Sequence, residues 1–195
     1  MNRFKWGGIK EHKEYYADET IRRMIYTHRN LLSNLAQTMF FAGASDEKVL
    51  NVLEKWYNEF PAEIIAYDAI RDNTISAANT YKMLYIKQLL DEKEGKTPQL
   101  SIEKRNLALE RSMEIAEAIA AEQFQYLDWY NTFRSRNRSD LMIFTRSSIM
   151  KEALGILGDN RVGSIGLLLL MFLNLLFEQQ SNCLCQFQIN NFHRY

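Results

Sequence analysis

The chain is poor in the residues that make turns, cross-links and metal sites. It has two prolines and eight glycines among 195 residues, which favours long helices over a β fold with many turns. Its two cysteines cannot build a disulfide framework, so we expect an intracellular, cytoplasmic protein in a reducing compartment. The N-terminus lacks the apolar stretch of a secretory signal.

Strong chemical motifs are also missing. The chain has three histidines and no Gly-rich phosphate loop, so we expect neither a cofactor nor a metal site. The formal net charge is zero, whereas a protein that mainly grips a nucleic-acid backbone usually carries a basic excess. These absences rank catalysis and simple backbone binding below structural roles.

Apolar residues that recur at helical spacing predict an all-α protein, a multi-helix bundle of about six helices. We divide the chain into a basic and aromatic N-terminal arm at 1–17, a helical bundle at 18–161, and an apolar C-terminal helix and tail at 162–195. The first helix is expected to bury one apolar stripe on one face, formed by Ile21, Met24, Ile25, His28, Leu31, Leu32, Leu35 and Met39.

The expected helix boundaries follow from capping residues and breakers. Three residues fit the N-cap position, where a side-chain oxygen accepts from the first turn: Asp18, Ser45 and Ser101. The second helix carries a stripe of Val49, Leu53, Trp56 and Phe60. Pro61 is expected to open a third helix that breaks or kinks near Asp72 and Asn73, and residues 91–98 form the clearest loop.

Residues 102 to about 133 contain no glycine or proline, which predicts one long central helix. Apolar residues alternate there at spacings of three and four, interrupted by Gln123. This spacing is typical of a coiled-coil seam with small residues in its middle, which allows close helix approach. The predicted interface residues of the seam are Leu109, Met113, Ala116, Ala120, Leu127 and Tyr130.

The C-terminal region changes composition abruptly. Residues 162–177 carry no charge, and only Glu178 and Arg194 are charged within 162–195. The sixteen residues of this apolar run span about 24 Å as a helix, short of the ~30 Å of a bilayer core. We therefore favour burial in protein, through Ile165, Leu168, Leu169, Phe172 and Leu176.

Other interpretations of this region stay open. It could be a tail anchor or a short membrane segment, with the N-terminal body cytosolic and Cys183 and Cys185 placed for acylation. It could also be an alternative or frame-altered terminus without an evolved role. A different alternative is nucleic-acid binding through Arg134, Arg136 and Arg138, helped by the arm at 1–17.

Arg23 and His28 form an Arg-x4-His pattern. It resembles the Arg-x(4–6)-His pattern of HEPN-type ribonucleases, which are all-α. The resemblance implies that His28 acts as acid or base on an RNA 2′-hydroxyl, with Arg23 near the phosphate. Met24 departs from the polar residue that often follows the arginine in that family. His28 also lies on the apolar stripe, so we prefer a structural histidine.

Taken together, the patterns predict a non-catalytic assembly or scaffold subunit. It would associate with copies of itself, or join a larger protein assembly, through the apolar C-terminal helix and the seam. Membrane association comes next, nucleic-acid binding follows, and a HEPN-like ribonuclease is ranked last.

Overall fold

The computed structural model describes residues 17–132 and 140–158, and within them the chain is helical, without a strand. Its helices are α1 Glu19–Phe41, α2 Asp46–Glu59, α3 Thr74–Lys93, α4 Ile102–Thr132 and α5 Asp140–Leu157. The predicted all-α class is confirmed for this part of the chain. The contacts divide the chain into two units, Met1–Ile156 and Leu157–Tyr195. Nearly all of the described residues belong to the first unit.

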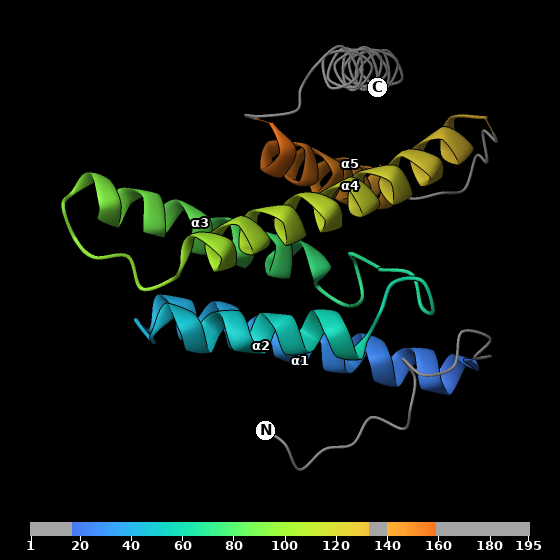
Figure 1. The fold of residues 1–195 in the computed structure, drawn as a ribbon. Helices are drawn as coiled ribbons and strands as arrows, with labels where there is room; N and C mark the ends of the chain where they lie inside the picture. Colours follow the sequence, from blue (N-terminus) through green and yellow to red (C-terminus); the bar gives the residue numbers. More distant parts are fainter. Residues whose placement is uncertain (1–16, 133–139, 159–195) are drawn as a thin grey trace, which may run out of the picture. The chain divides into compact units, whose positions relative to one another are not determined.

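Two helical hairpins form the framework of this unit (Figure 1). α1 and α2 run in opposite directions and are joined by residues 42–45, where Gly43 has a φ of +72°. α3 and α4 form the second hairpin, and both helices of the first hairpin contact α3. α5 joins α3 through Lys82, whose Nζ donates to the carbonyl oxygens of Gly155 at 3.0 Å and Ile156 at 2.7 Å.

The predicted boundaries hold at several helix ends. The Asp18 Oδ1 atom accepts from the backbone N–H of Ile21 at 2.8 Å, and Ser101 Oγ accepts from the N–H of Lys104 at 3.3 Å. Ser45 occupies the N-cap of α2, without a side-chain cap hydrogen bond. The caps at Asp18 and Ser101 satisfy donors that a helix cannot satisfy within its own first turn.

The core is built from large side chains of α2 and α3 and small ones between α3 and α4. The α2 stripe of Val49, Leu53, Trp56 and Phe60 is buried as predicted. Between α3 and α4, Ala77, Ala78 and Ala108 are fully buried, and Ser112 Oγ donates to the carbonyl of Ala78 at 3.0 Å. Small side chains at these positions let the two backbones approach closely.

The prediction of a third helix starting at Pro61 is wrong. Residues 61–73 form turns, and α3 begins only at Thr74, after Asn73 in the left-handed region at φ +55°. The physical reason is an arginine from α1: Arg29 donates to the backbone carbonyls of Phe60, Ile65 and Ala66. Carbonyls that would accept helical hydrogen bonds are satisfied by a side chain instead.

The predicted single stripe of α1 is also partly wrong. Its fully buried side is formed by Ile25, Arg29, Ser33 and Ala36. Three members of the predicted stripe, Met24, Leu31 and Leu35, are exposed. α1 packs against both α2 and α3, and its buried side includes Arg29 and Ser33, which an apolar pattern does not reveal.

A closed set of hydrogen bonds ties three distant segments together at one end of the bundle. Asp46, in the first turn of α2, is buried and accepts from Lys87 Nζ and Gln88 Nε2, both at 2.6 Å. Gln88 Oε1 accepts from the N–H of Leu100 at 3.0 Å, and the N–H of Asp46 donates to Gln99 Oε1 at 3.0 Å. We call these residues the Asp46 cluster.

Candidate functional site

Arg23 and His28 do not converge on a common site. Both lie on α1, where a separation of five residues places side chains about 140° apart around the helix. Arg23 is exposed and pairs with Glu19 at 3.1 Å. The Nδ1 atom of His28 lies 2.6 Å from the carbonyl of Met24, and its ring stacks on Phe60 with 6.3 Å between centroids. His28 is therefore held by its own helix and the core.

The predicted seam of α4 lies against the chain's own bundle. Met113, Ala116, Ala120 and Leu127 are buried within the described unit, and Leu109 is half-buried. Gln123, which interrupts the seam, is fully buried and accepts from Arg146 Nη1 of α5 at 3.0 Å. A second chain could reach these side chains only if the packing of α4 opened.

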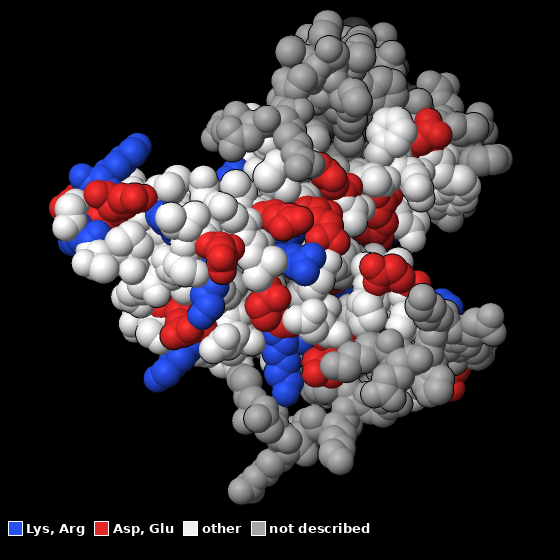
Figure 2. Space-filling model, viewed as in Figure 1, with Lys and Arg blue, Asp and Glu red and all other residues white. Residues whose placement is uncertain are grey.

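Several predicted site residues lie outside the described residues. These are the arginine cluster Arg134, Arg136 and Arg138, the side chain of Tyr130, and the apolar residues Ile165, Leu168, Leu169, Phe172 and Leu176, together with Cys183, Cys185 and most of the 1–17 arm. On the face shown in Figure 2, the basic side chains of the described residues are interspersed with acidic ones. That face carries no continuous basic strip among the described residues.

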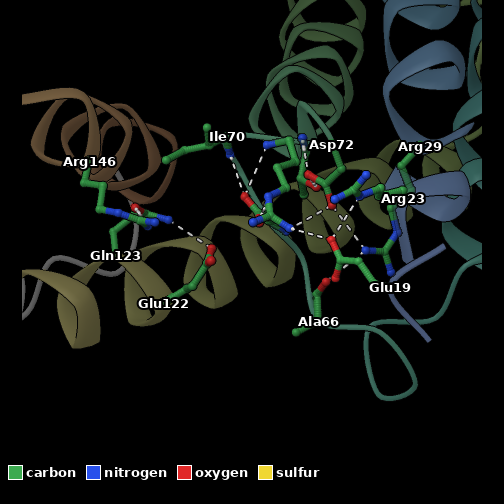
Figure 3. A network of polar contacts seen from close by, with 12 residues as sticks. Glu19, Arg23, Arg29, Ala66, Ile70, Asp72, Glu122, Gln123 and Arg146 are labelled. Carbon is green, nitrogen blue, oxygen red and sulfur yellow. Dashed lines mark hydrogen bonds and ion pairs between the residues drawn. The ribbon is translucent and has the colours of Figure 1, made fainter. Parts of the chain in front are cut away.

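A buried ion pair organises the centre of the unit (Figure 3). Arg29 Nη1 lies 3.2 Å from Asp72 Oδ2, and both side chains are completely buried. Arg29 also donates to the carbonyls of Phe60 at 2.9 Å, Ile65 at 2.6 Å and Ala66 at 3.1 Å. Burial raises the pKa of Asp72, while the neighbouring Arg29 charge opposes that change. The pair fixes the turns of 61–73 against α1.

Asp72 shapes the start of α3 as well. Its Oδ2 atom accepts from the N–H of Asp68 at 3.0 Å, and its Oδ1 atom accepts from the N–H of Thr74 at 3.1 Å and from the Thr74 hydroxyl. Tyr67 lies between the Arg29 guanidinium, 4.9 Å from its ring centroid, and the ring of Trp56, which is 5.6 Å away. Asp72 thereby holds Asp68 in place. Tyr67 and Asp68 form one wall of a groove.

This groove has a volume of about 740 Å³, within the size range of small-molecule sites. We call it the aromatic groove, and its rings and charges come from three separate segments: Tyr26 of α1, Tyr67 and Asp68 of the 61–73 turns, and Glu122, Tyr126 and Trp129 of α4. Among the lining residues that the structure describes, two are carboxylates and none is basic. The lining therefore combines aromatic faces with negative charge.

Glu122 is the most perturbed carboxyl group of the groove. Burial is the largest cause that raises its pKa to about 7, and Asp68 and Asp72 raise it further, while Arg146 and a hydrogen bond with the Ala69 backbone lower it. Its Oε2 atom accepts from Gln123 Nε2 at 2.9 Å, as Figure 3 shows. Near neutral pH this carboxyl group changes its charge.

A second surface feature is the α1 row, which consists of Met24, Leu31 and Leu35. These side chains are 56%, 60% and 38% exposed. Their spacings of seven and four residues place them within about 40° of one another around the helix. The 30–41 segment that carries most of the row contains no charged residue, although exposed helix faces are usually charged.

Sequence reasoning missed Arg29, Asp72 and every residue of the aromatic groove. The groove residues are separated by up to about a hundred positions, so no local spacing could reveal them. One signal was available for Arg29: it lies four residues after Ile25, on the side of α1 that the structure buries. A charged residue at such a position needs a buried partner.

No helix of the described residues combines the length and the apolar character needed to cross a membrane. No three His, Cys, Asp or Glu side chains of these residues are grouped so that they could hold a metal ion. Comparison of the chain with protein-family models, curated proteins and solved structures finds no match.

Proposed function

We propose that the chain is a non-catalytic assembly subunit that pairs with a second copy of itself, and that the α1 row is part of the contact. The observation that carries this proposal is the exposure of Met24, Leu31 and Leu35 on one helix face, which is uncharged around Leu31 and Leu35. Scattered exposed apolar residues are common on soluble proteins, but an aligned row without flanking charge is typical of a covered surface.

A second copy is the partner that this chemistry fits best. The spacings of seven and four residues resemble those by which helices pair in coiled coils. The exposed polar side chains beside Leu31 and Leu35 are Thr27, Asn34 and Thr38, and Arg23, beside Met24, is paired with Glu19. Two identical faces can therefore meet around Leu31 and Leu35 without like-charge repulsion. A two-fold contact also lets each copy cover the row of the other.

The finer architecture belongs to the same proposal. We expect about six helices in all, with α4 as the long central helix and residues 162–177 as an apolar C-terminal helix. A row of three side chains is small beside the roughly 800 Å² that each partner buries in a stable interface. The apolar run of 162–177 would supply the remaining area of the assembly.

The test is size-exclusion chromatography with light scattering on the full chain and two matched double variants. Leu31→Glu with Leu35→Glu places charges on the α1 row. Ile86→Glu with Leu90→Glu makes the same change at two exposed α3 residues with the same spacing. We expect the wild type and the α3 variant to form the same oligomer, and the α1 variant to dissociate.

Two results would count against the proposal. A wild-type chain that is monomeric at micromolar concentration would remove the assembly function. An α1 variant with unchanged mass would remove the α1 row from the contact, and a truncation to 1–161 would then show whether the C-terminal run alone holds the copies together.

A further inference from the structure

We propose that the aromatic groove binds an organic ammonium ion, either a free amine or the side chain of a lysine in a peptide. The juxtaposition that carries this inference is four aromatic rings and two carboxylates around one cavity of about 740 Å³. This inference does not depend on the pairing of copies proposed above.

The rings provide the first part of the recognition. Tyr26, Tyr67, Tyr126 and Trp129 line the groove from three segments of the chain. The face of an aromatic ring carries negative potential and attracts cations, most strongly for tryptophan. Rings on several sides of one cavity favour an alkylated or extended ammonium ion over a small, strongly hydrated metal ion.

The protein already uses the same attraction at these rings. The Arg146 guanidinium lies 3.7 Å from the centroid of Tyr126, Arg71 lies 5.8 Å from that of Tyr26, and Arg29 lies 4.9 Å from that of Tyr67. None of these arginines is among the lining residues of the groove. These contacts show that the tyrosine rings of the groove attract cations within the fold itself.

Negative charge provides the second part of the recognition of an ammonium ion. Asp68 and Glu122 are the charged residues among the described lining of the groove, and Asp68 and Asp72 also raise the pKa of Tyr26, after the larger effect of burial. Arg29 is paired with Asp72, and Arg71, which is 58% exposed, pairs with Asp68 at 3.3 Å. A carboxylate inside a partly desolvated cavity attracts a cation more strongly than one in bulk water.

Binding should depend on pH through Glu122. The groups that face this carboxyl are Asp68, Asp72 and Arg146, together with the Gln123 amide and the Ala69 backbone. Since its pKa is about 7 without ligand, the charged form grows as the pH rises through neutrality. A cation favours that form, so affinity should increase from about pH 6 to about pH 8 by linkage.

The experiment is an NMR titration of the full chain that follows the indole N–H signal assigned by Trp129→Leu. The ligands are tetramethylammonium, 1,4-diaminobutane, a blocked tripeptide with a central lysine, and tert-butanol as a neutral analogue of tetramethylammonium. We expect the cations to bind and tert-butanol to bind at least about tenfold more weakly, the loss expected for a removed charge. Tighter binding of the diamine identifies a free amine as ligand, and tighter binding of the tripeptide identifies a peptide lysine.

Variants separate the groove from general surface attraction. Glu122→Gln removes the charge and the pH dependence, and should weaken binding about tenfold at about pH 8. Glu110→Gln makes the same change at an exposed residue of α4 outside the groove, and should change affinity less than about twofold. Equal binding of tert-butanol, equal effects of the two variants, or no binding by any cation would overturn the inference.

Discussion

Replacement of Arg29 by methionine should destabilise the fold more than any change at an exposed arginine of α1. Arg29 and Asp72 are both completely buried, and methionine fills a similar volume without donors. The substitution leaves Asp72 without its cation and the carbonyls of Phe60, Ile65 and Ala66 without the donor that now reaches them. Removing one partner of a buried pair costs about 3–5 kcal/mol.

The expected cost of Arg29→Met is large relative to the total free energy of unfolding. A domain of this size is typically stable by about 5–15 kcal/mol, so Arg29→Met would remove a major part of the free energy of unfolding. Arg23→Met is the matched control on the same helix. Arg23 is 75% exposed and pairs with the exposed Glu19, and such surface pairs contribute about 0–1 kcal/mol.

The assay is urea unfolding followed by far-UV circular dichroism, on Arg29→Met, Asp72→Asn and the double variant. Asparagine keeps an oxygen that can still accept from the Thr74 N–H, which limits the damage from the second change. The double variant should be less destabilised than the sum of the single ones by roughly 1–3 kcal/mol, because contacting residues are coupled. A cost below about 1 kcal/mol for Arg29→Met, or additive single effects, would refute the reasoning.

Three further predictions concern other parts of the unit. The pKa of Glu122 is raised to about 7, so the folded chain binds more protons than the unfolded chain between about pH 4.5 and 7, and stability falls as the pH rises through that window. Glu122→Gln should remove this fall, which urea unfolding at both ends of the window would measure. If the free energy of unfolding changes with pH equally in the variant and the wild type, the prediction is wrong. Ala78→Leu should cost about 1–3 kcal/mol by overpacking the α3–α4 contact, and an unchanged urea midpoint would contradict the close packing. Asp46→Ala should cost roughly 1–3 kcal/mol, because Gln88 loses a buried acceptor, whereas Glu47→Ala, at an exposed neighbour, should shift the urea midpoint far less.

Much of the fold of the described residues was predictable because its signals are local. The cap at Asp18 and the cap at Ser101 each depend on side chains within a few positions of one another. The loop predicted at 91–98 was correct only after Lys93, where α3 ends. The α2 stripe was predicted correctly because α2 presents one apolar face, with Trp56 and Phe60 buried at its end. These features need no knowledge of distant contacts.

The errors have a common cause, which is a buried charge. Residues 61–71 show an apolar pattern typical of a helix. However, Arg29, more than thirty positions earlier, donates hydrogen bonds to the backbone carbonyls of Phe60 and Ile65, which such a helix would use for its own hydrogen bonds. The aromatic groove could not be predicted for a different reason: Tyr26, Asp68 and Trp129 are far apart in the sequence and meet only after the chain has folded. The function remains a proposal because it depends on partners rather than on the chain alone.

The Asp46 cluster has a consequence for local motion in the bundle. Helix ends normally fray, with amide hydrogens that exchange far faster than those of the helix centre. In this chain the first turn of α2, the last turns of α3 and residues 99–100 share one set of hydrogen bonds, so none of them can open without the others. We expect their amides to exchange with deuterium at one common, slow rate, as a single cooperative unit made of three separate pieces of chain.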